Sequence, residues 1–77
     1  MNVERLVTMA NDIGDFFQAE PDREEAVAGI QNHLQRFWDP RMRAKIRAYA
    51  DGGGEGLAEP VKAAILRLVA PAVPSKG

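Results

Sequence analysis

The sequence predicts an all-α fold, a small bundle of three to four helices followed by a disordered C-terminal tail. Apolar residues recur at steps of three and four, and no segment shows the alternation of a β-strand. Proline or glycine interrupts the pattern between segments. With 77 residues, the chain is long enough for one small core. We therefore expect one helical domain over residues 1–70 and a flexible tail over residues 71–77. The helices themselves are expected over residues 3–19, 23–37, 40–50 and 60–70.

The first two helices are separated by a proline and an acidic cap. Pro21 is expected to end the first helix, and Asp22 is predicted to be the N-cap of the second. Glu25 follows Asp22 at the spacing of a capping box, in which each side chain bonds the backbone of the other residue. The apolar stripes comprise Val3, Leu6, Ala10, Ile13 and Phe17 in the first helix, and Ala26, Ile30, His33, Leu34 and Phe37 in the second.

The third and fourth helices each begin with an acidic residue followed by proline. Asp39 is predicted to be an N-cap and Pro40 the first helical residue. Because proline disfavours a helical backbone at the preceding residue, the second and third helices must meet at a bend. Residues 52–56 are rich in glycine and are expected to form a flexible connector. Glu59 is then predicted to cap the fourth helix.

The apolar arc of the first predicted helix is wide. It covers roughly half of the circumference, against the ~100° that a surface helix needs. Met9 and Phe16 lie seven residues apart at one edge of this arc. Either the partner helices cover them, or they form an exposed apolar patch of the kind that marks an interface. We predict that Met9 and Phe16 contact a partner protein, with burial in the bundle as the alternative.

Charge is segregated along the chain. Residues 1–25 carry seven acidic and two basic side chains, a net −5, whereas residues 36–47 carry five basic and one acidic, a net +4. Arg41, Arg43 and Arg47 are therefore candidates for docking onto carboxylates of another chain. Alternatively, they pair with the acidic first half at about 0–1 kcal/mol per exposed pair. Binding to DNA is disfavoured, because the acidic half repels phosphate and the arginines straddle an apolar stripe.

Residues of the types that commonly act in catalysis or bind metals are scarce in this chain. The chain has no cysteine and one histidine, which excludes disulfides, thiolate metal sites and histidine clusters. No serine or threonine is accompanied by a base, and the glycine run lacks the lysine of a phosphate-binding loop. We predict no catalytic, cofactor-binding or metal-binding residue. The absence of a signal-peptide pattern and of about 18 consecutive apolar residues predicts a cytoplasmic protein without a membrane span.

One block of residues carries a family resemblance. The block Phe37-Trp38-Asp39-Pro40-Arg41-Met42-Arg43 is its most specific part, and the match extends over residues 6–68. The chain resembles the delta subunit of soluble, NAD-dependent, molybdenum-containing formate dehydrogenases. The other matching residues are Leu6-Val7, Met9-Ala10-Asn11, Ile13-Gly14, Phe16-Phe17, Pro21-Asp22, Gly29-Ile30, His33-Leu34, Gly52-Gly53, Leu57 and Pro60-Val61.

The resemblance implies a small accessory subunit without a cofactor of its own. In such complexes the large catalytic subunit carries the molybdenum–pterin centre that oxidises formate to carbon dioxide, and companion subunits carry iron–sulfur clusters, flavin and the NAD site. The delta subunit is expected to bind and stabilise the large subunit or to aid its assembly. Within the shared block, Asp39 and Pro40 are expected to fix the bend, while Trp38 is either a core residue or an interface anchor.

Two alternatives from other functional classes stay open at this point. One is a transient chaperone for insertion of the molybdenum cofactor, in which the arginines hold the pterin phosphate. The other is a small helical DNA-binding module. The sequence also leaves open whether the isolated chain associates with itself.

Overall fold

The computed structural model describes residues 2–68, and all regular structure in this range is helical. The all-α prediction is therefore confirmed. The predicted tail, residues 71–77, lies outside the described range. The fourth helix was expected to reach residue 70 but ends at Leu66, since residues 67 and 68 form a turn. No helix within residues 2–68 combines the length and apolar character needed to cross a membrane. The helices are α1 (Val3–Phe16), α2 (Arg23–Phe37), α3 (Pro40–Asp51) and α4 (Glu59–Leu66).

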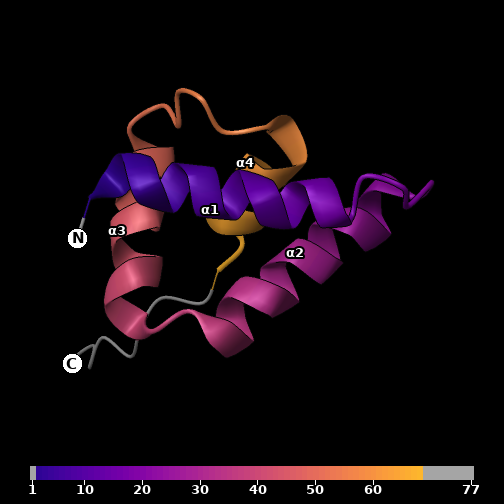
Figure 1. Cartoon of the computed structure of the whole chain (residues 1–77), viewed down its shortest axis with the longest axis horizontal. Helices are drawn as coiled ribbons and strands as arrows, with labels where there is room; N and C mark the ends of the chain where they lie inside the picture. Colours follow the sequence, from indigo (N-terminus) through magenta and orange to yellow (C-terminus); the bar gives the residue numbers. More distant parts are fainter. Residues whose placement is uncertain (1, 69–77) are drawn as a thin grey trace.

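The shortest helix, α4, lies at the centre of the bundle. It packs against α1, α2 and α3, and Figure 1 shows it behind α1, with α3 and α2 towards opposite ends of α1. An eight-residue helix is marginal by itself in water, so α4 depends on this packing. Its side chains Val61, Ala64 and Ile65 are fully buried, and they share the core with Ile30 and Leu34 of α2.

Side-chain caps set the starts of α2 and α3. A carboxylate oxygen of Asp22 accepts the backbone N–H of Glu24 at 2.9 Å, and Asp39 accepts that of Met42 at the same distance. Pro40 is the first residue of α3. The predicted capping box between Asp22 and Glu25 is wrong in both halves: Asp22 accepts the N–H of Glu24 instead of that of Glu25, and its own N–H donates to the carboxylate of Glu20 at 3.3 Å. Glu20 reaches this donor because the preceding chain turns back on itself.

Two further helix boundaries differ from expectation. The first helix ends at Phe16, three residues earlier than predicted, because the N–H groups of Phe17 and Gln18 bond carbonyls only three residues back. The fourth helix begins at Glu59 itself, with Ala58 at the N-cap and no side-chain cap. The prediction that Glu59 caps this helix is wrong, because its carboxylate is bonded to Arg23 of α2 instead.

The glycine-rich connector between α3 and α4 follows a defined path. The side chain of Asn11 in α1 donates to the carbonyl of Gly56 at 2.9 Å and accepts the N–H of Ala58 at 3.0 Å. The hydroxyl of Tyr49 donates to the carbonyl of Glu55 at 2.5 Å. Gly54 has φ +63°, a conformation that glycine adopts without strain. These bonds join the connector to α1 and α3, while its flexibility stays a prediction.

Candidate partner interface

Three aromatic side chains lie together on the surface between α1 and α2. Phe16 is 82% exposed and Phe37 is 67% exposed, although both are large apolar residues. His33 joins them: its ring lies 4.8 Å from that of Phe37, and it lines a shallow hollow together with Phe16. We call Phe16, His33 and Phe37 the aromatic patch. Exposed apolar surface of this kind in a soluble domain usually marks a binding site.

The hollow within the patch has a volume of about 290 Å³ and is lined by Asp12, Ile13, Phe16 and His33. Ile13 forms its apolar floor, because it is half-buried and packs against the core. The two edges of the patch differ in charge. Asp12 lies on the α1 side, and Arg36 lies on the α2 side with its guanidinium 5.7 Å from the Phe37 ring centre. Apolar area and a charge gradient thus occur on the same surface.

Of the residues predicted to contact a partner, Phe16 and Arg41 are the freely accessible ones. Arg41 is exposed and has neither a hydrogen bond nor an ion pair within the described range. Met9 is half-buried and packs against the core, so it supplies only part of its surface.

Trp38 belongs to the hydrophobic core. Its side chain is 5% exposed and lies in the cluster that includes Leu34 and Ile46. The tryptophan follows directly on α2, and its N–H still bonds the carbonyl of Leu34 at 3.1 Å. Of the two roles left open by the sequence, the structure shows the core role. An interface contact would require the bundle to open.

Arg43 and Arg47 are engaged within the fold. The guanidinium of Arg43 donates to the carbonyl of Trp38 and, at 3.3 Å, to that of Gln35 at the end of α2. Arg47 donates to the carbonyl of Leu68 at 3.0 Å and pairs with Asp51. These bonds join α3 to the end of α2 and to the segment after α4. Both side chains are half-buried, which limits the charge that they offer to a partner.

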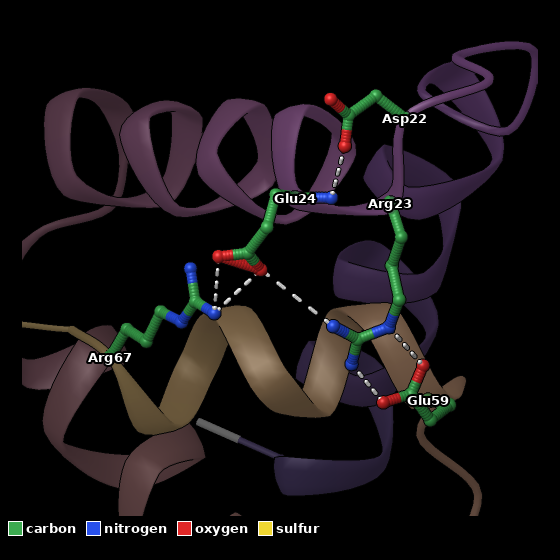
Figure 2. Close-up of polar contacts among 5 residues, drawn as sticks. All are labelled: Asp22, Arg23, Glu24, Glu59 and Arg67. Atoms are coloured by element: carbon green, nitrogen blue, oxygen red, sulfur yellow. Dashed lines mark hydrogen bonds and ion pairs between the residues drawn. The ribbon is translucent and has the colours of Figure 1, made fainter.

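A network of ion pairs links α2 to α4, and Figure 2 shows it. Arg23 bonds Glu59 through two nitrogens, while Arg67 donates to both carboxylate oxygens of Glu24, at 2.8 and 3.0 Å. The hydrogen bond from Arg67 lowers the pKa of Glu24, and that from Arg23 lowers the pKa of Glu59. The bond with Glu59 in turn raises the pKa of Arg23. All four side chains are exposed, so the network mainly orients the two helices.

A second hollow, of about 320 Å³, lies where the end of α1 meets the starts of α2 and α4. Gly14, Phe17, Ala26 and Val61 supply apolar lining. Arg23 lies at its rim, but its guanidinium is already bonded to Glu59. Within residues 2–68, His, Asp and Glu side chains form no group of three or more that could hold a metal ion.

Sequence reasoning missed the exposure of Phe37. Its position on the apolar stripe of α2 predicts burial, but it is the last residue of the helix. Trp38 fills the neighbouring end of the core, so Phe37 is left at the surface. Two aromatic residues in succession at a predicted helix end were the available signal, since only one of them can point inward.

The chain is similar to one known family along most of its length. The family model described as NADH-dependent formate dehydrogenase delta subunit, FdsD, matches residues 5–65. This range holds the aromatic patch and every residue that the sequence predicted to contact a partner. No curated protein and no solved structure matches the chain.

Proposed function

We propose that this chain, which belongs to the delta subunit family of NADH-dependent formate dehydrogenases, binds the large subunit of that enzyme. The family match over residues 5–65 is the observation that carries this proposal. In it, the chain is a non-catalytic accessory subunit. Molybdenum–pterin, iron–sulfur clusters, flavin and the NAD site belong to the other subunits.

The aromatic patch is the surface that we assign to this contact. Phe16 and Phe37 expose most of their rings to water. Burying this apolar surface in an interface is favourable by about 25 cal/mol per Å². Aromatic and arginine side chains dominate the binding energy of many interfaces, and Arg36 and Arg41 are exposed arginines of α2 and α3. Binding stabilises whichever folded partner it engages, by mass action.

Co-purification from the host tests this function. A tagged copy of the chain is captured from cell extract, bound proteins are identified by mass spectrometry, and molybdenum is measured in the same fraction. We expect the large subunit in equal amount, with its molybdenum. Recovery of only the molybdenum-free large subunit would identify a transient assembly factor instead, and absence of the large subunit would contradict the proposal.

Surface variants test the assigned contact. Phe16→Ser together with Phe37→Ser is expected to lower recovery of the large subunit at least tenfold, because both rings are lost from the interface. Leu66→Ser is the matched control, since Leu66 is also a partly exposed apolar residue but lies on α4, outside the patch. Equal recovery with all variants would place the contact elsewhere on the chain.

A further inference from the structure

We propose that two copies of the free chain associate through the aromatic patch about a twofold axis, with Phe37 of each copy seated in the hollow beside Phe16 of the other. The axis lies in the plane of the interface, perpendicular to the line from Phe16 to Phe37. This dimer is inferred from the chain's own surface and does not depend on the identity of another partner.

The aromatic patch combines a protruding ring at one end with a recess at the other. Phe37 projects from the end of α2 and is 67% exposed. At the other end of the patch, Asp12, Ile13, Phe16 and His33 line the hollow of about 290 Å³. His33 lies between them, because it lines the hollow and also contacts Phe37. A twofold rotation exchanges the two ends, so each protruding ring meets a recess.

The charges at the two ends of the patch indicate that its binding partner is a second copy of the chain. Asp12 lies at the recess, and Arg36 lies beside the protruding Phe37. Within the described range neither residue forms an ion pair. The same twofold rotation places Asp12 of one copy opposite Arg36 of the other, and it does so twice. A self-complementary surface of this kind is what an isologous interface requires.

The size of the patch makes the dimer weak. A phenylalanine side chain contributes roughly 150–250 Å² when fully buried, and part of each ring is already covered in the free chain, so two rings per copy supply less than half of the ~800 Å² per partner in a standard interface. We therefore expect a weak dimer that forms mainly at high protein concentration. The same rings serve both contacts, so dimer formation and binding of the large subunit exclude each other, a consequence that rests on the proposed function.

Sedimentation equilibrium of the purified full chain, from low micromolar to millimolar concentration, tests the dimer. The wild-type chain should fit a monomer–dimer equilibrium. Phe37→Ser should weaken it at least tenfold, whereas the control Leu66→Ser should leave it unchanged. A chain that stays monomeric at the highest concentration, or a dimer that persists in Phe37→Ser, overturns the proposal.

Charge exchange tests the orientation of the two copies. Asp12→Arg and Arg36→Asp each place like charges opposite one another and should each weaken the dimer severalfold. The double variant restores opposite charges across the interface and should recover most of the wild-type affinity. Circular dichroism establishes that each variant keeps its helicity. Failure of the double variant to recover, with helicity intact, overturns the twofold arrangement, and none of these measurements involves another subunit.

Discussion

Phe37 and Trp38 are adjacent in the sequence but lie in different environments. Phe37 is the last residue of α2, and Trp38 adopts an extended backbone with φ −88° and ψ 141°. This change of backbone directs the indole into the core, while the phenyl ring stays at the surface. The bend that Asp39 and Pro40 impose therefore also determines which aromatic residue is buried.

Replacing Trp38 or Phe37 with alanine tests this difference in burial. Trp38→Ala should lower the unfolding free energy by about 3–5 kcal/mol, the usual loss for a buried aromatic side chain. A domain of this size has roughly 3–5 kcal/mol in total, so the isolated variant should be largely unfolded. Phe37→Ala should stay within about 0.5 kcal/mol of wild type. Urea denaturation followed by circular dichroism tests both, and a folded, stable Trp38→Ala protein would place the indole outside the core.

Gly14 allows α1 to approach α4 closely. A Cβ atom at this position would lie 2.4 Å from Cγ2 of Val61, which is fully buried. Valine in a helix is confined largely to one rotamer, so its methyl group cannot easily move. Gly14→Ala should therefore destabilise the fold by about 1–3 kcal/mol, although alanine is favoured over glycine in a helix by about 1 kcal/mol.

The control for this prediction is the same change in a Val61→Ala background. Removal of the valine methyl groups relieves the clash, so Gly14→Ala should no longer destabilise there. Urea denaturation of the wild type, the two single variants and the double variant completes this double-mutant cycle. An equal loss in both backgrounds would show that Val61 is not the cause.

At the scale of helices, the sequence predicts those helix boundaries that depend on neighbouring residues in the chain. Asp22, Asp39 and Pro40 lie at the helix starts where side-chain capping and proline geometry place them. The end of α4 depends instead on distant partners: Gln31 donates to the carbonyl of Arg67 at 3.1 Å, beyond the helix end at Leu66. No sequence pattern shows that a donor 36 positions away will take this carbonyl.

The same limit applies to the candidate interface. The exposure of Phe16 was predictable, because the apolar arc of α1 is too wide for its neighbours to cover. The contacts of Arg43 and Arg47 were not predictable, because their acceptors are backbone carbonyls of α2 and of the segment after α4. A basic helix in a sequence does not reveal which of its guanidinium groups are already bonded.

Arg43 should be a structural residue of the α2–α3 junction. Arg43→Met keeps much of the aliphatic stem but removes the donors to the carbonyls of Gln35 and Trp38, and we expect a loss of about 1–3 kcal/mol. Arg41→Met is the matched control on the same helix and should change stability by less than about 0.5 kcal/mol. Thermal and urea unfolding of both variants test this. Equal stability would leave Arg43 available as an interface charge.

The network between α2 and α4 should make stability depend on pH. The pKa values of Glu24 and Glu59 are lowered in the folded state, so their contribution is fully present above the unfolded value of about 4.3. It is lost as the pH falls through the folded pKa values below that point. The melting temperature should therefore decline as the pH falls below the unfolded value of about 4.3.

Variants isolate this contribution. Glu24→Gln with Glu59→Gln should melt below wild type at pH 7, and the difference should shrink as the pH falls and the wild-type carboxylates become protonated. Glu55→Gln, a carboxylate outside the network, should keep the wild-type pH dependence. High salt should shrink the difference at pH 7, since the pairs are exposed. A difference that persists unchanged at pH 3 would assign the effect to packing.

At the scale of the whole molecule, the fold combines a small core with uncovered aromatic surface. The chain contains no cysteine, so no disulfide reinforces the bundle. Its centre is an eight-residue helix that depends on its three neighbours. Such a domain is expected to be stable by only a few kcal/mol in isolation, while Phe16 and Phe37 remain exposed to water. Both features favour a chain whose stability increases when a partner covers it.

Binding of the large subunit should therefore raise the stability of this chain measurably. At a free concentration of the large subunit 100 times the dissociation constant, the folded state gains about 2.7 kcal/mol, provided that the unfolded chain does not bind. Amide hydrogen exchange of fully buried residues such as Ile30 and Ile65 should slow by about a hundredfold where it proceeds through global unfolding. Phe16→Ser with Phe37→Ser should exchange like wild type when free but gain much less protection from the large subunit. Protection confined to the patch, with unchanged exchange in the core, would show that the contact does not select the folded bundle.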